Sequence, residues 1–242
     1  MSIYFSLIIP AFNEAKRLTN SLDKIKEFLD QQSFSYEVLV VENGSQDETF
    51  EIAQQCSDRF ENFTVIHEDL VGKGNAVRVG MLAAKGEYRF MCDADLSMPI
   101  EEVLNFLPPQ VSDPQIVIAS REIKGAVRYD EPESRHLGGR VINALIQWIV
   151  LPGIEDSQCG FKLFSAEIAD DLFRAQTLDG WSFDIELLAI ARLRGYQIKE
   201  IPVSWYFAEE SKIKPIRDAI RMTADMFRVR RNLKQGKYDK KV

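Results

Sequence analysis

The chain has 242 residues, of which 45% are hydrophobic, so it is long enough to bury a large core. Its longest nearly unbroken apolar run, residues 141–151, is too short to cross a bilayer as a helix, and its three widely spaced cysteines indicate neither a disulfide framework nor a CxxC metal site. The N-terminal residues lack the pattern of a secretory signal, so we expect a cytoplasmic protein.

The net charge of −7 is unevenly distributed along the chain. Residues 212–242 contain 11 Lys and Arg against 3 Asp, a balance of +8 that leaves −15 for residues 1–211. A basic segment of this kind can contact phosphates or an anionic membrane surface, although a solvated helix is the more common outcome. We expect no nucleic-acid partner.

Short β-branched and aromatic runs alternate with helical patterns up to residue 120, which predicts an α/β fold with a mostly parallel sheet. The expected strands are Tyr4–Ile9, Tyr36–Val41, Phe63–Ile66, Tyr88–Cys92 and Ile116–Ser120. The expected helices between them are Glu14–Gln32, Glu48–Ser57, Asn75–Ala84 and Ile100–Leu107.

The alternation changes after Ser120. A polar stretch, residues 122–135, leads to an amphipathic segment, residues 137–151. A strand at Phe161–Phe164, a helix at Phe183–Arg194 and a strand at Gln197–Val203 are expected to follow. Because no repeat or linker divides the sequence, we predict a single domain.

Polar residues follow several expected strands, at the positions where an open parallel sheet binds its ligands. They are Asn13 and Glu14 after the first strand, Glu42 and Asn43 after the second, Asp93 and Asp95 after the fourth, and Arg121 after the fifth.

Asp93 and Asp95 lie two residues apart, so both carboxylates can reach one hard cation. Oxygen ligands suit Mg²⁺ or Mn²⁺, which also bind diphosphate oxygens. A solvated turn is the competing interpretation of a lone DxD, but its place at a strand end favours a metal site.

The sequence Gly72-Lys73-Gly74-Asn75 precedes an expected helix. Free backbone N–H groups at a helix start, together with a lysine, can hold phosphate. The glycine spacing is neither a Walker loop nor GxGxxG, so a plain helix-start turn is the alternative.

Four ordered blocks resemble the family 2 glycosyltransferases: IIPAFNEA, VVENGSQDET, GKGNAVRVGM and DADLS. In the second half, GIEDSQCGFKLF, GWSFDIELL, IPVSW and ESKIKP resemble the dolichyl-phosphate β-glucosyltransferase branch, with the dolichyl-phosphate mannose synthases as near relatives. The resemblance implies the GT-A nucleotide-sugar-binding fold over residues 1–242. Residues 1–121 would form the nucleotide-sugar-binding half, 122–211 the acceptor half and 212–242 a basic amphipathic tail.

The resemblance also implies roles for donor-binding residues. Pro10, Ala11, Asn13 and Glu14 would border the nucleoside, and Glu42 would meet the base with Asn43 beside it. Lys73 and Lys212 would lie near the diphosphate. Asp93 would face the ribose or donor sugar and assist the metal, and Asp95 would bind Mg²⁺ or Mn²⁺. Many members of the family have DDGS where this chain has Glu42-Asn43-Gly44-Ser45, which leaves the base open. Ser97, where mannose synthases often have Gln, favours the glucosyl branch.

On the acceptor side, Asp156 is the candidate to orient the acceptor or to act as base, beside Asp93 and Arg121 as further catalytic candidates. The candidate acceptor-phosphate residues are Arg121, Arg135, Lys162, Asp184 and Glu186. Because Asp184 and Glu186 lie two apart on an expected helix, at most one should point into the site. A helix cap at Asp156, a solvated Glu186 and plain surface charges are the competing interpretations.

The leading hypothesis is an inverting transfer of glucose from UDP-glucose to a polyprenyl phosphate, dolichyl or undecaprenyl. A lipid monophosphate has a second pKa of about 6, so it is largely ionised at neutral pH and needs no strong base. GDP-mannose as donor, a soluble saccharide as acceptor and a non-enzymatic nucleotide-binding module are the alternatives.

Two segments predict a peripheral position at the cytoplasmic membrane face. Residues 137–151 carry an apolar stripe wider than a half-buried helix requires, and Ile213–Leu233 combines apolar with basic residues, as interfacial helices do. Packing of both helices on the sheet, or a homodimer contact, is the alternative.

Overall fold

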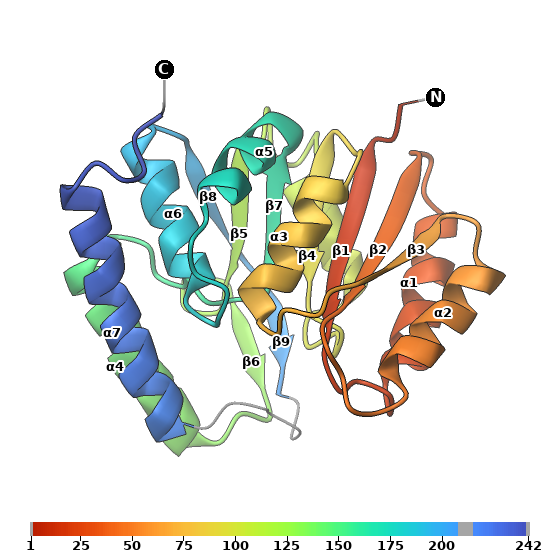
Figure 1. The fold of residues 1–242 in the computed structure, drawn as a ribbon, viewed down its shortest axis with the longest axis horizontal. Coiled ribbons are helices and arrows are strands. Elements are labelled where there is room, and N and C mark those ends of the chain that lie inside the picture. The colour runs from red at the N-terminus through yellow and green to blue at the C-terminus, as the bar shows by residue number, and fades with distance from the viewer. Residues whose placement is uncertain (1, 208–214, 241–242) are drawn as a thin grey trace.

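The computed structural model describes residues 2–207 and 215–240 and has a seven-stranded sheet covered by helices on both faces (Figure 1). The strand order is β3-β2-β1-β4-β7-β5-β8, and β7 runs antiparallel to its neighbours β4 and β5 while the other pairs in this sheet are parallel. The strands are β1 (Phe5–Ala11), β2 (Tyr36–Glu42), β3 (Phe63–His67), β4 (Tyr88–Cys92), β5 (Ile116–Ser120), β7 (Phe161–Ser165) and β8 (Ile198–Pro202).

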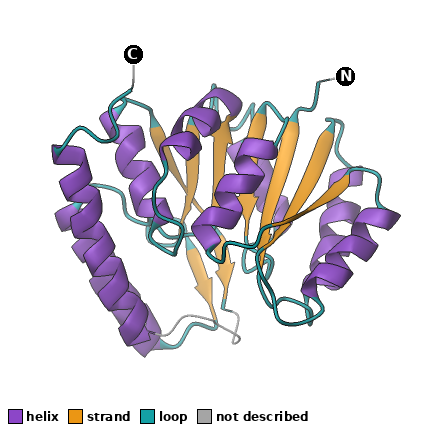
Figure 2. Cartoon of the chain, viewed as in Figure 1, coloured by secondary structure: helices purple, strands orange, loops and turns teal. Residues whose placement is uncertain are grey.

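Helices and one short ribbon complete the fold (Figure 2). The ribbon pairs β6 (Val127–Tyr129) with β9 (Ser204–Tyr206), whose Tyr129 and Tyr206 rings stack with centroids 4.5 Å apart. The helices are α1 (Leu18–Asp30), α2 (Thr49–Arg59), α3 (Lys73–Ala83), the 3₁₀ helix η1 (Ile100–Phe106), α4 (Glu133–Ile149), α5 (Ala166–Ala175), α6 (Phe183–Leu193) and α7 (Pro215–Lys234).

Both faces of the sheet are buried, which explains why its central strands are nearly continuous apolar runs. In β1, Leu7 and Ile9 face one core with α1, α2 and η1, while Ile8 faces a second core with α3, α5 and α6. In the first core, Phe90, Phe106 and Phe161 pack edge to face with centroids 4.5–5.5 Å apart. The predicted α/β sheet with flanking helices is thus confirmed.

The first helix begins at Leu18, four residues later than the expected Glu14. Side chains from the loop after β2 hold the backbone of the intervening residues in a turn. Asn13 donates its N–H to Ser45 Oγ at 3.0 Å, and Glu14 donates to Thr49 Oγ1 at 2.7 Å. These contacts between distant segments could not be read from local sequence. The strands β6 and β9 and the helix α5 were also not predicted.

The two helices expected to be interfacial lie side by side at one end of the sheet (Figure 1). α4 covers most of the predicted segment 137–151, and α7 covers the described part of Ile213–Leu233. Each buries one face, with Ile146 and Ile149 from α4 and Met226 and Val229 from α7 in the second core. Their outer faces keep large apolar side chains exposed, namely Leu137, Val141, Trp148, Ile220 and Phe227. In the ranges 2–207 and 215–240, every helix is too short or too polar to span a membrane.

The aromatic cluster of the first core predicts a large stability cost for Phe106→Ala. The ring is fully buried, so we expect a loss of about 3–5 kcal/mol in the free energy of unfolding, measured by urea denaturation. Phe227→Ala is the matched control, because that ring is 55% exposed and its loss should cost less than about 1 kcal/mol. Equal losses in the two variants would contradict this assignment of the core.

Candidate active site

Lys73 and Asp93 meet at the carboxyl edge of the sheet. Lys73 opens α3, and Asp93 directly follows β4; their Nζ and Oδ1 atoms are 2.5 Å apart. Burial by itself lowers the pKa of the lysine, but the nearby carboxylates of Asp93, Asp184 and Asp95 raise it by more. The ammonium group is therefore held in its charged form.

The glycines beside Lys73 allow the start of α3 to pack closely on the segment before α6. A Cβ on Gly74 would lie 2.6 Å from the Cβ of Phe183, and one on Gly72 would lie 2.3 Å from the carbonyl oxygen of Asp179. The Gly-Lys-Gly sequence is thus explained by close packing that leaves Lys73 beside Asp93.

Asp93 and Asp95 offer a donor set that fits Mg²⁺ or Mn²⁺ bound together with a substrate. Asp95 Oδ1 accepts a hydrogen bond from Ser97 N at 2.9 Å, which fixes the turn after β4. Within residues 2–207 and 215–240, no group of three His, Cys, Asp or Glu side chains is placed to hold a metal alone. Mg²⁺ is commonly bound through one or two carboxylates plus substrate phosphates, so two are sufficient.

Gly160 stands directly against Asp93 and was not singled out in the sequence. A Cβ at this position would lie 1.9 Å from Asp93 Oδ2. The closeness arises because β7 runs antiparallel to β4, with Phe161 opposite Cys92, so the residue before β7 meets the residue after β4. Only the sheet pairing reveals it.

Lys162 and Asp184 form a buried ion pair. Lys162 Nζ lies 2.7 Å from Asp184 Oδ1 and donates to the carbonyl oxygen of Cys159 at 2.5 Å. Burial raises the pKa of Asp184, against the lowering effect of Lys162 and Lys73. Lys162 is only 1% exposed, so the pair lies in the interior next to the site. This position gives no evidence for the predicted contact of Lys162 with an acceptor phosphate.

Glu186 lies outside this group of charges and is engaged by other parts of the chain. Its carboxylate accepts hydrogen bonds from Thr177 N at 2.9 Å, Leu178 N at 2.8 Å and the Tyr238 hydroxyl at 2.6 Å. These contacts tie the loop before α6 and the C-terminal segment to the helix. Of Asp184 and Glu186, only Asp184 joins the charged group, as the helical spacing predicts.

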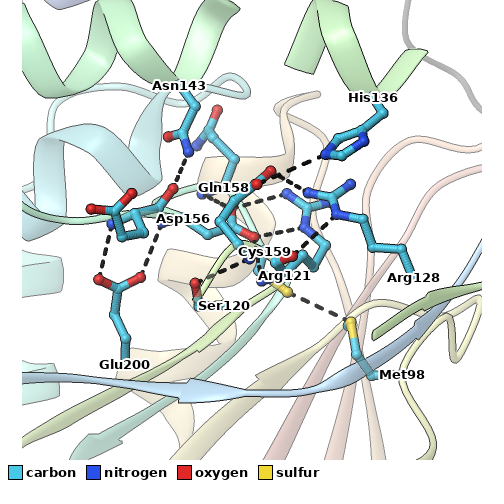
Figure 3. A network of polar contacts seen from close by, with 12 residues as sticks. Met98, Ser120, Arg121, Arg128, His136, Asn143, Asp156, Gln158, Cys159 and Glu200 are labelled. Atoms are coloured by element: carbon cyan, nitrogen blue, oxygen red, sulfur yellow. Dashed lines mark hydrogen bonds and ion pairs between the residues drawn. The ribbon is translucent and has the colours of Figure 1, made fainter. Parts of the chain in front are cut away.

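Arg121 and Asp156 make a two-pronged ion pair (Figure 3). Arg121 donates from Nε to Asp156 Oδ2 at 2.7 Å and from Nη2 to Oδ1 at 3.0 Å, and its backbone N–H also donates to Oδ2 at 3.0 Å. Burial raises the pKa of Asp156, but Arg121 lowers it by more, so the carboxylate stays ionised. The guanidinium carbon lies 5.5 Å from the centre of the Trp205 ring.

The remaining predicted cations are Arg135 and Lys212. Arg135 lies at the start of α4, with its guanidinium carbon 4.8 Å from the centre of the Phe207 ring. Lys212 lies outside the described residues, so the structure gives no position for it.

At the other end of the edge, Glu42 is buried and already engaged. Its Oε1 accepts the Ser45 N–H at 2.5 Å, and its Oε2 lies 2.6 Å from His67 Nδ1. Burial raises the pKa of Glu42, but the bonds from Ser45 and His67 lower it by more. His67 is the exposed member of the pair, and Glu42 and Asp69 raise its pKa. Because its ring is accessible, His67 is a candidate contact for a nucleobase. The sequence did not indicate this residue.

The contacts of Asn43 explain why a neutral amide suits this position. Its Nδ2 donates to the carbonyl oxygens of Leu70 at 2.6 Å and Glu68 at 3.3 Å, and its Oδ1 accepts from Gly72 N at 2.6 Å. A carboxylate can make only the last of these contacts. Asn43 therefore holds the loop that leads to Lys73, instead of lying free beside a base.

The structure brings together the residues that follow β1 and β2. Asn13 has a left-handed backbone (φ 52°), and its Oδ1 accepts from Gln46 N at 2.7 Å. Glu14 pairs with Arg17 at 2.6 Å. Pro10 is half-buried and Ala11 is buried at the end of β1.

The strand order arranges these groups in a line along one edge. His67 and Glu42 lie at β3 and β2, Lys73 and Asp93 at β4, and Arg121 with Asp156 next to β5 and β7. Along this line, an end with a carboxylate and an imidazole is followed by a centre with a lysine and carboxylates, and then by a second ion pair. This order matches a ligand made of a nucleobase, a diphosphate and a transferable group. This fold and edge are those of a GT-A glycosyltransferase.

The chain belongs to glycosyl transferase family 2, whose model matches residues 6–173. Dolichyl-phosphate β-glucosyltransferases of Trichomonas vaginalis and Drosophila melanogaster are 34% and 35% identical to it; each comparison covers 94% of this chain, and 71% and 74% of the relatives. A structure of glucosyl-3-phosphoglycerate synthase from Mycobacterium tuberculosis with Mn²⁺, UDP and glucosyl-3-phosphoglycerate has a TM-score of 0.68 at 18% identity, covering 94% of this chain and 80% of that one. At that identity the likeness concerns the fold.

The contact between Gly160 and Asp93 predicts that Gly160→Ala lowers transferase activity. The added methyl group must displace the Asp93 carboxylate, and a shift of about 1 Å at a catalytic group can cost about 100-fold in rate. Steady-state transfer kinetics measure the loss. Gly180→Ala is the matched control, because a Cβ there meets no atom within 4 Å. Equal activity of the two variants would show that Asp93 is not confined by Gly160.

Proposed function

We propose that this chain transfers glucose from UDP-glucose to a polyprenyl phosphate such as dolichyl phosphate, with inversion at the anomeric carbon. The observation that carries the proposal is the placement of the Arg121–Asp156 ion pair on the same sheet edge as Lys73, Asp93 and Asp95. The names of the relatives, dolichyl-phosphate β-glucosyltransferases, support the sugar and the lipid.

On the donor side, the leaving group is a nucleoside diphosphate whose negative charge grows as the bond to the sugar breaks. Lys73, held charged by Asp93, would face that charge as a cation. Mg²⁺ or Mn²⁺ held by Asp95 with Asp93 would neutralise further charge on the diphosphate. A fold neighbour in complex with Mn²⁺ and UDP supports both the metal and the donor.

On the acceptor side, a phosphate monoester carries its nucleophilic oxygen already ionised, so Asp156 need not remove a proton. Its carboxylate is held ionised and oriented by Arg121, and we assign it to positioning of the acceptor. Arg121 adds positive charge where the anionic acceptor must approach an anionic donor. A single attack from the side opposite the diphosphate inverts the anomeric centre.

For the nucleotide part of the donor, the proposal favours UDP over GDP. GDP-mannose is the competing donor, because near relatives within the family are mannose synthases. Calorimetry in Mn²⁺ or Mg²⁺ decides between them: we expect tighter binding of UDP than of GDP. A clear preference for GDP would move the assignment to mannosyl transfer.

Metal dependence is the second test of the donor site. Asp95→Ala should lower glucose transfer by at least about 100-fold, because loss of charge neutralisation at the diphosphate removes several kcal/mol from transition-state stabilisation. Chelator should abolish transfer by the unaltered protein, as measured with radiolabelled UDP-glucose and a polyprenyl phosphate. Asp58→Ala is the control, because that carboxylate is exposed on α2. Full activity in excess chelator would contradict the metal assignment.

We also propose that α4 and α7 place the enzyme at the cytoplasmic face of a membrane, where a lipid acceptor is held. Leu137, Val141 and Trp148 are 55–80% exposed on one face of α4, and α7 adds exposed Ile220 and Phe227. Exposed arginines of α7, Arg217, Arg221, Arg228, Arg230 and Arg231, suit anionic headgroups.

Sedimentation with anionic liposomes tests this position. Trp148→Glu should lower the bound fraction several-fold, because a charge replaces an exposed ring at the acyl boundary, and high salt should lower it further. Leu193→Glu is the control, since Leu193 is 45% exposed at the end of α6 and belongs to neither α4 nor α7. A homodimer through the same faces would appear instead as a dimer in analytical ultracentrifugation that Trp148→Glu dissociates, with no liposome binding.

A further inference from the structure

Glu200 holds the backbone of the loop that carries Asp156. Both of its carboxylate oxygens accept hydrogen bonds from consecutive N–H groups: Oε2 from Glu155 at 2.9 Å and Oε1 from Asp156 at 3.0 Å (Figure 3). A carboxylate that accepts two backbone N–H groups makes charge-assisted bonds and fixes the direction of the peptide as well as its position.

The sheet puts Glu200 in place for this contact. β8 lies parallel to β5, and Glu200 is paired with Ile118, two residues before the end of that strand. Arg121 directly follows β5. The strand pair β5–β8 therefore positions both Arg121, which bonds the Asp156 carboxylate, and Glu200, which accepts the Asp156 backbone N–H. The loop from Pro152 to Ser157 has little regular structure of its own to hold it.

Contacts from α4 reach the same peptide unit. The Asn143 amide donates to the carbonyl oxygen of Glu155, and Gln147 Nε2 donates to Glu155 Oε2 at 3.2 Å. The peptide between Glu155 and Asp156 is thus held through its carbonyl by α4 and through its N–H by Glu200.

We infer that Glu200 is a positioning residue for the transfer reaction, which acts through Asp156 and touches neither donor nor acceptor. The inference rests on the proposed role of Asp156 in orienting the acceptor phosphate. Without the two hydrogen bonds that Glu200 accepts, the Arg121–Asp156 pair can still form, but the loop that carries Asp156 can shift. The acceptor is then held in a less productive geometry.

Steady-state kinetics of Glu200→Gln and Glu200→Ala test the inference. Gln keeps one acceptor oxygen and places an NH₂ group against the second N–H, whereas Ala removes both acceptors. We expect kcat to fall by about 10-fold in the Gln variant and more in the Ala variant, the scale on which small displacements of a catalytic group act. The KM for UDP-glucose and the calorimetric affinity for UDP should stay within about twofold, because the donor half is untouched. Glu61→Gln, an exposed carboxylate before β3, is the matched control.

A double variant separates positioning from general loss of structure. If Glu200 acts only through Asp156, adding Glu200→Gln to Asp156→Asn should produce no further loss of kcat. Losses that multiply, a weakened UDP affinity in the Glu200 variants, or kinetics of Glu200→Gln equal to those of Glu61→Gln would each overturn the inference. Normal kcat in Asp156→Asn would instead refute the proposed role of Asp156, which distinguishes failure of the proposed function from failure of this inference.

Discussion

The antiparallel strand β7, inserted between β4 and β5, is the constraint on which the site depends. Parallel strands bring only the residues after their carboxyl ends to the active edge. Because β7 starts at that edge, it adds the residues that precede it, and so places Gly160 against Asp93 and the loop of Asp156 against Arg121. The Lys73–Asp93 pair and the Arg121–Asp156 pair therefore lie at the same edge of the sheet.

Oppositely charged side chains form ion pairs close to this strand. Lys162 pairs with Asp184 in the interior, and Lys73 pairs with Asp93 at the surface of the site. Each buried charge is expensive unless a partner lies close, and removal of one partner leaves the other uncompensated, commonly at about 3–5 kcal/mol. The arrangement keeps Lys73 charged, and in the proposed reaction it would limit the reorganisation required when a diphosphate leaves.

The residue types at Glu42 and Asn43 after β2 also have a physical explanation. The longer Glu42 side chain reaches both Ser45 N and His67, its register partner on β3. The amide of Asn43 donates and accepts at once, which a carboxylate cannot do, and so closes the loop between β3 and α3. This end of the site is thus held together by the side chains of Glu42 and Asn43 themselves.

The sequence by itself determined the class of fold, the order of the elements up to Ser120, and the groups after the strands, because apolar periodicity and strand-end polarity are local properties. It also identified Asp156, Arg121, Lys73, Asp93 and Asp95 as candidates, through their places after strands or in the family blocks. Only the tertiary structure decided that Lys162 is buried under the site, that Glu186 serves the loop before α6, and that Gly160, His67 and Glu200 contact the candidates. The contacts of Gly160, His67 and Glu200 depend on strand pairing between segments far apart in the sequence, such as Glu42 with His67 and Asp93 with Gly160, and local patterns carry no information on which distant strands will pair.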